Sequence, residues 1–309
     1  MNIVEKLWDT IINNGLGALF KPWQIKRVAL AEAISKRKQM LIEAQTEMDI
    51  IKIKSGAVTI DDKGEKTLSN DLIDALLMDE NLQVIKRKMN LLNAVDKTFT
   101  LLESDTEKCD ERSEKPSDEW FDRWREYSEK ANTEEVQNLW ARILNQEIRY
   151  GGSVSLRTLD FIRSVSTNEA KLIEKVFSFS IENLLVYNIT NDTSDLTDDK
   201  KSLLPKMGVT KHALSELQYL GIIEGVNSFG VISDIPSSFT DKYYQKIEIG
   251  DKNITISNMD KNSKVFFLSY QFTILGLELI KILQLKKDIA YFIQLFNNLR
   301  AKGFEVIIE

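Results

Sequence analysis

Apolar residues recur with a helical period in the middle of the chain, between Trp120 and Leu159. Trp120, Trp124 and Tyr127 are four and three residues apart, so they share one face of a predicted helix. A second stripe follows and is broad enough to be buried on two sides; it consists of Val136, Leu139, Trp140, Ile143, Leu144 and Ile148. The pattern predicts the buried core of a helical bundle.

Start and stop signals divide this region and the residues that follow it into four helices. The pair Asn132-Thr133 can cap the second helix, and the pair Gly151-Gly152 can end it, because glycine takes the left-handed conformation without strain. Either Ser153 or Ser155 can begin the third helix. A capping box running from Ser166 to Glu169 predicts the start of the fourth. The connections between these helices are therefore expected to be short.

Three segments of this region resemble a bacterial family, the domain of unknown function 2806 (DUF2806). They are Asp118-Glu119-Trp120, NTEEVQNLWARILNQEI at 132–148, and GSVSLRTL at 152–159. The family pattern is EEMQxLWAxILAxE followed by PGSFSxRTL, and here Gly151 replaces the usual proline and Val154 the common phenylalanine. The resemblance extends from about residue 85 to the C-terminus and implies a bacterial or phage origin. It carries no established activity, so no catalytic residue is transferred.

Residues 1–104 are predicted to form an N-terminal helical region. Its expected parts are a short amphipathic helix at 1–20, a long helix from Pro22 to about Lys54, and two helices near 70–79 and 81–103. The polar segment 55–70 is predicted to be a loop, and the charged segment 104–119 an exposed linker. The helical core of the resembling family then occupies residues 118–185, with its last helix ending near Ile181.

The pattern changes after a second polar segment, 188–201, which is also predicted to be a linker. Within residues 200–309, the string ALSELQYLGII at 213–223 resembles the second helix and exit of a winged-helix unit. A hairpin is expected at 243–259, a buried strand at 265–272, two helices after it, and a closing strand from Phe304. The expected fold is mainly α with a C-terminal α+β part: a helical bundle followed by a winged-helix-like domain.

Composition limits the classes of function and the compartment. The formal net charge of −6 argues against a protein that binds polyanions over its whole surface, although it permits a local basic patch. Cys109 is the single cysteine, which excludes an intramolecular disulfide and a cysteine-rich metal cluster. No signal peptide and no apolar run of about 18 residues is present, so we expect a cytoplasmic protein, or one peripheral to the inner membrane.

The sequence offers little catalytic chemistry. His212, the only histidine, follows Lys211 in the first turn of a predicted helix, a position typical of a surface or capping residue. The signatures of zinc hydrolases, serine hydrolases and P-loop proteins are absent. Asp118, Glu119 and Asp122 would need convergent geometry to hold magnesium. We therefore expect no catalytic residue, no metal, no cofactor and no small-molecule substrate.

Nucleic-acid binding is an alternative that a winged-helix-like domain would permit. The recognition helix and its approach would then supply Lys206, Lys211, His212 and Ser215, and the wing would supply Lys246 and Lys252. Glu216 and Glu224 reduce the positive charge of this region. Winged helices also serve as protein-interaction modules, so the fold does not fix the function.

The N-terminus suggests a second alternative. An amphipathic segment, a glycine-containing segment and a basic segment follow one another, and this order suits an anionic membrane surface or a buried oligomer contact. The residues expected in such a contact are Val4, Leu7, Trp8, Ile11, Leu16, Leu19, Phe20, Lys26 and Arg27. Packing against another helix or subunit is the favoured interpretation.

The combined expectation is a non-enzymatic interaction or scaffold protein that associates with itself as a homo-oligomer. The setting expected for such an uncharacterised bacterial family is phage defence or stress sensing, because families of this kind often occur there. The two alternatives are a DNA-binding protein that uses the C-terminal domain and a membrane-acting effector that uses residues 1–20.

Overall fold

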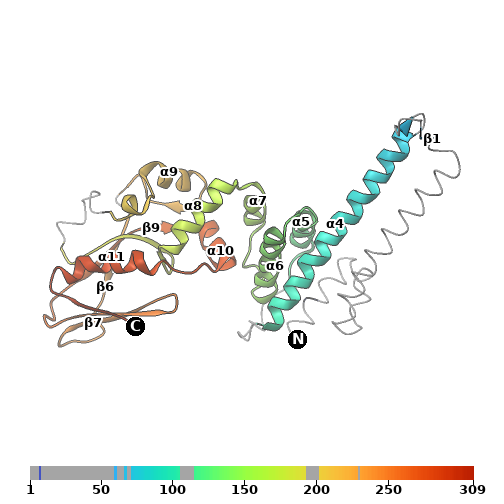
Figure 1. Ribbon diagram of the computed structural model, residues 1–309. Coiled ribbons are helices and arrows are strands. Elements are labelled where there is room, and N and C mark those ends of the chain that lie inside the picture. The colour runs from blue at the N-terminus through green and yellow to red at the C-terminus, as the bar shows by residue number, and fades with distance from the viewer. Residues whose placement is uncertain are drawn as a thin grey trace. The chain divides into compact units, whose positions relative to one another are not determined.

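The computed structural model describes Leu7 and residues 59–60, 66–67, 71–104, 115–192, 202–228 and 230–309. The chain divides into two compact units, Met1–Gly152 and Ser153–Glu309 (Figure 1). In its described residues, the first unit is helical apart from a pair of short strands. The second is an α+β unit with antiparallel sheets, as the C-terminal pattern predicts.

Three helices form the described body of the first unit. They are α4 (Asp71–Ser104), α5 (Asp118–Ser128) and α6 (Glu134–Arg149), and α4 packs along α6 with α5 against both. The two helices predicted near 70–79 and 81–103 are a single helix, because no glycine or proline interrupts residues 71–104. The segment predicted as a loop at 55–70 contains the antiparallel pair β1 (Thr59–Ile60) and β2 (Lys66–Thr67).

The predicted aromatic face of α5 and the predicted cap of α6 are both confirmed. Trp120, Trp124 and Tyr127 are buried, and the Thr133 side chain accepts a hydrogen bond from the amide of Val136. Trp124 Nε1 donates to the carbonyl of Trp140, 2.9 Å away, which joins α5 to α6. Val136 itself is 39% exposed, so its predicted place in the buried stripe is wrong. It lies in the first turn of α6, where Glu134 and Glu135 are exposed as well.

The second unit begins with α7 (Leu156–Ser164) and α8 (Thr167–Ser178), whose predicted N-caps Ser155 and Ser166 are confirmed. The helix predicted to reach about Ile181 ends at Ser178, and β3 (Ser180–Ile181) and β4 (Leu184–Thr190) follow. The expected linker from residue 188 is therefore wrong at its start. Asn188 and Thr190 are buried in β4, where their polar side chains are satisfied by Asn298 Nδ2 (3.1 Å) and Lys302 Nζ (3.0 Å).

The larger sheet of this unit is built around β9 (Val265–Phe272), the strand predicted at 265–272. One edge of β9 pairs with β4, with a bulge at Tyr187, and β4 pairs with β3. The other edge pairs with β5 (Ile223–Glu224) and then with β6 (Val231–Ile235). The connecting helices are η4 (Leu204–Met207), α9 (Lys211–Tyr219), α10 (Ile274–Leu283) and α11 (Ile289–Arg300).

A second sheet has the strand order β10-β8-β7. Its strands β7 (Tyr243–Ile249) and β8 (Lys252–Asn258) form the predicted hairpin, and β10 (Glu305–Ile308) is the predicted closing strand. The hairpin turn is Gly250-Asp251, and Gly250 takes the left-handed φ of 64° that such a turn requires. The hairpin pairs with β10 and not with β5, the strand that follows α9.

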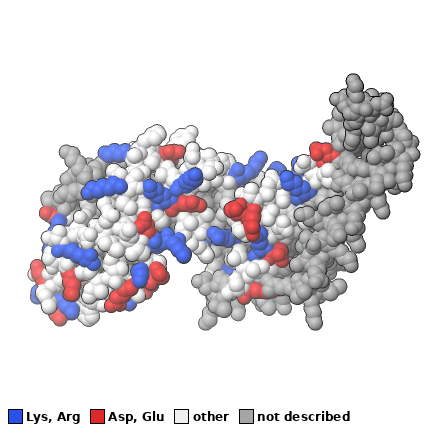
Figure 2. Space-filling model, viewed as in Figure 1, with Lys and Arg blue, Asp and Glu red and all other residues white. Residues whose placement is uncertain are grey.

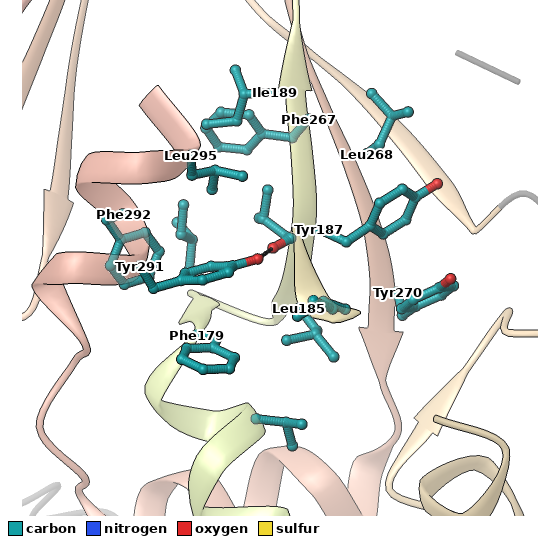
Figure 3. Packing of buried hydrophobic residues seen from close by; sticks show 14 of the residues in the cluster. Phe179, Leu185, Tyr187, Ile189, Phe267, Leu268, Tyr270, Tyr291, Phe292 and Leu295 are labelled. Atoms are coloured by element: carbon teal, nitrogen blue, oxygen red, sulfur yellow. Dashed lines mark hydrogen bonds between the residues drawn. The ribbon is translucent and has the colours of Figure 1, made fainter. Parts of the chain in front are cut away.

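Aromatic side chains fill the interior between α11 and the larger sheet (Figure 3). The ring of Phe179 stacks on Tyr291 with 4.3 Å between centroids, and Tyr187 lies 4.8 Å from Tyr270 across β4 and β9. The Tyr291 hydroxyl donates to the carbonyl of Val186, so the one polar group of this ring is satisfied inside the core. The hydrogen bond from Tyr291 fixes α11 against β4, and the contact between Tyr187 and Tyr270 joins β4 to β9.

Candidate interaction sites

The first half of α4 extends past the ends of α5 and α6 in Figure 1. Nine consecutive residues, Asp79–Arg87, are exposed, and we refer to them as the projecting segment. The segment includes three large apolar side chains, Leu82 (42% exposed), Val84 (48%) and Ile85 (36%). Leu82 and Ile85 share one side of α4, whereas Val84 lies on the other side. Water-facing turns of a helix are normally polar, so Leu82 and Ile85 mark a surface for interaction.

Helical geometry shows that this apolar surface is separate from the body of the unit. Leu82 and Leu91 are nine residues apart, which is two and a half turns, so they point to opposite sides of α4. Leu91 is fully buried. Thr98, on the same side as Leu91, donates its hydroxyl to the carbonyl of Ala141 in α6 at 3.3 Å. Leu82 therefore faces away from the side on which α6 packs.

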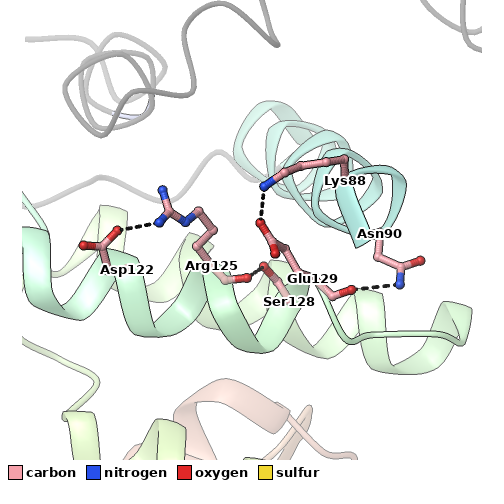
Figure 4. A network of polar contacts seen from close by, with 6 residues as sticks. All are labelled: Lys88, Asn90, Asp122, Arg125, Ser128 and Glu129. Atoms are coloured by element: carbon pink, nitrogen blue, oxygen red, sulfur yellow. Dashed lines mark hydrogen bonds and ion pairs between the residues drawn. The ribbon is translucent and has the colours of Figure 1, made fainter. Parts of the chain in front are cut away.

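A polar network fixes α4 where the projecting segment ends (Figure 4). Lys88 Nζ forms an ion pair of 2.6 Å with Glu129, and Asn90 Nδ2 donates to the Glu129 carbonyl at 3.0 Å. Arg125 pairs with Asp122 at 3.2 Å, and its carbonyl accepts from the hydroxyl of Ser128 at 3.0 Å. This network joins α4 to the end of α5, so the projecting segment starts from a fixed base.

The same network borders an open hollow of about 700 Å³. Its lining is charged and consists of Lys88, Glu119, Asp122, Arg123, Arg125, Glu126 and Glu129. The carboxylates have cationic partners, among them Glu126 with Lys130 at 2.7 Å and Glu119 with Arg123 at 4.0 Å. The residues considered for magnesium, Asp118, Glu119 and Asp122, do not form a metal-binding group, and none is found in the part of the chain that the structure describes.

The segment GSVSLRTL has a structural role in the second unit. The amide of Ser155 donates to Glu278 Oε2 at 2.7 Å, and the hydroxyl of Thr158 donates to the same oxygen at 2.6 Å. The side chains of Val154 and Leu159 are buried beside this contact. Glu278 lies on α10, so the motif fastens the start of α7 to α10. Sequence reasoning missed Glu278, since a single glutamate about 120 residues away carries no local signal.

One buried pair resembles catalytic chemistry at first sight. Lys287 Nζ lies 2.6 Å from Ser180 Oγ and 3.2 Å from the carbonyl of Phe177, and burial lowers the pKa of Lys287. Lysine beside serine is a known arrangement for activating a nucleophile. Ser180, however, is fully buried and donates its own hydroxyl to the Phe177 carbonyl at 2.7 Å. The group therefore satisfies carbonyls at the end of α8, where a cation is favourable.

The structure separates the residues predicted to contact nucleic acid into two groups. The first group is exposed and lies on two elements that follow one another in the chain: Lys206 in η4, and Lys211, His212 and Ser215 in α9. Lys246 on β7 and Lys252 on β8 belong to the other sheet, and Figure 1 shows that hairpin on the opposite side of the unit from α9.

Charge of both signs is spread over the surface. The face shown in Figure 2 carries Lys and Arg side chains interspersed with Asp and Glu on both units. Near α9, Lys175 Nζ of α8 lies 3.0 Å from the position that a Cβ atom at Gly208 would take. Lys175 therefore adds a cation beside the turn that joins η4 to α9.

Most of the predicted N-terminal contact residues lie outside the described part of the chain. Leu7 is described, and it is helical and fully buried. The remaining predicted contact residues lie outside the described part of the chain; they are Val4, Trp8, Ile11, Leu16, Leu19, Phe20, Lys26 and Arg27. Among the residues described, no helix combines the length and the apolar character needed to cross a membrane.

Comparison with known proteins gives one match. The family model described as "Protein of unknown function (DUF2806)" matches residues 81–296, which include most of α4, all of α5 to α10 and the first part of α11. No curated protein and no solved structure matches the chain. The matched residues cover more than half of the sequence and contain the three segments on which the resemblance rests. The chain belongs to the DUF2806 family.

Proposed function

We propose that this protein is a non-enzymatic interaction protein that associates with itself through the projecting segment of α4. The observation that carries the proposal is the exposure of Asp79–Arg87, with Leu82 and Ile85 on the side of α4 turned away from α6. The polar contacts of Glu278 at the start of α7 and of Lys287 at the end of α8 satisfy hydrogen-bonding groups of the fold. Polar groups used in this way support a non-enzymatic role.

The expected association is weak and depends on concentration. Leu82 and Ile85 are 42% and 36% exposed, and covering them in two copies removes this apolar surface from water. The surface is small, and association also costs translational and rotational freedom. A dimer is therefore expected at high protein concentration.

The test is sedimentation equilibrium of the full chain from about 10 μM to about 500 μM. The molar mass should rise toward twice that of the chain, and the double variant Leu82→Glu/Ile85→Glu should stay monomeric. Its matched control, Gln83→Glu/Val84→Glu, adds the same charge on the sides of the helix turned away from Leu82 and Ile85 and should associate like the unchanged protein. A chain that is monomeric throughout, or a double variant that associates normally, would overturn the proposal.

We propose nucleic-acid contact at the start of α9 as a second candidate function. It is supported by the exposed Lys206 and Lys211 together with Lys175 beside Gly208. Fluorescence anisotropy with duplex DNA at low salt should show binding that Lys206→Glu/Lys211→Glu abolishes. Lys246→Glu/Lys252→Glu is the matched control and should bind like the unchanged protein. If this variant lost binding, a winged-helix mode that uses the hairpin would be favoured. Absence of binding to duplex DNA would reject this candidate.

A further inference from the structure

We infer that two copies of the projecting segment pair antiparallel about a two-fold axis, with Asp79 of each copy beside Lys86 of the other. This inference rests on the self-association proposed above and names its partner, orientation and register. It is carried by the order of charges along the exposed half of α4 and by the face on which the apolar residues lie.

The charges of the projecting segment are opposite at its two ends. Asp79 and Glu80 stand at one end, and Lys86 and Arg87 stand seven residues later at the other. All four side chains are exposed, and none forms an ion pair with another residue that the structure describes. The segment therefore presents a negative end, an apolar middle and a positive end.

Seven residues correspond to about two turns of an α-helix, so Asp79 and Lys86 flank the stripe of Leu82 and Ile85 on the same side. A parallel pair in register would place like ends together. An antiparallel pair centred between Leu82 and Gln83 places Asp79 of each copy next to Lys86 of the other. Two-fold symmetry forms this favourable contact twice, because such an interface uses the same patch on both copies.

The apolar stripe is accessible to a second helix. Ile85 and Ala94 are nine residues apart and point to opposite sides of α4, as do Leu82 and Leu91. Ala94 and Leu91 are fully buried. Thr100 near the end of α4 is exposed, and it lies five turns from Leu82 on the same side of the helix. A helix lying along Leu82 and Ile85 therefore approaches α4 from the side opposite to α6.

Charge reversal tests the register. Asp79→Lys and Lys86→Asp should each raise the dissociation constant of the dimer about tenfold, since two attractive contacts become repulsive. The doubly exchanged chain, Asp79→Lys/Lys86→Asp, should associate like the unchanged protein. An equimolar mixture of the two single variants should form a heterodimer with restored affinity. Glu80→Lys is the matched control, because Glu80 lies on another side of the helix and should have a much smaller effect.

Distance measurement tests the orientation. A spin label at Ser104→Cys in the Cys109→Ser background marks the far end of α4, and double electron–electron resonance gives the distance between labels. In the antiparallel pair the labels should be about 65 Å apart, from about 1.5 Å per residue on each side of the centre. A distance of about 10–20 Å would indicate a parallel pair and overturn the inference while self-association stands. A monomer at every concentration would overturn both proposals, and unrestored affinity in the exchanged chain would overturn the register.

Discussion

The hydroxyl group of Tyr291 is enclosed in the interior of the second unit, where the ring is fully buried and donates to the carbonyl of Val186. Burial raises the pKa of Tyr291 above its ordinary value of about 10. The unfolded chain loses this proton near pH 10, whereas the folded chain retains it. The free energy of unfolding should therefore fall above about pH 10, by up to about 1.4 kcal/mol per pH unit for this group.

Tyr291→Phe tests this contribution in urea unfolding measured between about pH 8 and pH 11. The variant should be less stable near neutral pH by about 1 kcal/mol, because it loses a buried hydrogen bond. Its stability should then fall less steeply above pH 10. Lys287, whose pKa burial lowers, contributes equally to both proteins, so the comparison removes its opposite effect. Tyr219→Phe is the control on an exposed ring, and an identical slope for Tyr291→Phe would contradict the prediction.

At the scale of elements, Glu278 determines how α7 begins against α10. Glu278→Ala leaves the amide of Ser155 and the hydroxyl of Thr158 without their shared acceptor. We expect a loss of about 1–3 kcal/mol of stability, with faster hydrogen exchange concentrated in α7. Glu278→Gln keeps one acceptor oxygen, so its stability should lie between that of Glu278→Ala and that of the unchanged protein. Glu174→Ala on the exposed face of α8 is the control, and unchanged exchange in α7 for Glu278→Ala would refute the assignment.

Local signals predicted the helices of this protein better than its strands. The caps at Thr133, Ser155 and Ser166 were predictable because a cap involves residues three apart in the sequence. No strand was predicted at β4, since Asn188 and Thr190 look like linker residues until Asn298 and Lys302 supply their hydrogen bonds. Burial of those polar groups depends on contacts more than 100 residues away, which no local pattern contains.

The projecting segment could not be predicted for a similar reason. Apolar residues occur on both sides of α4, with Leu82 and Ile85 on one side and Leu91 and Ala94 on the other. The sequence shows this distribution but not which side the neighbouring helices cover. Leu82 is exposed and Leu91 is buried because α6 packs on the side of Leu91.

At the scale of the whole molecule, the family match from residue 81 to 296 covers parts of both compact units. The motif at 152–159 stands where the first unit ends and the second begins, and its serine and threonine belong to the second. The family pattern therefore describes a helical body joined to an α+β unit.

The pairing of β9 with β4 also sets the order in which the protein can be completed during synthesis. The first unit has all its described helices once residue 149 has been made. In the second unit, in contrast, β4 must wait for β9 about 80 residues downstream, and β8 must wait for β10. At about 5–20 residues per second, translation leaves β4 without its neighbour for roughly 4–16 s. During that interval the nascent chain presents an unpaired apolar strand, which is the stage most exposed to misfolding and to capture by chaperones.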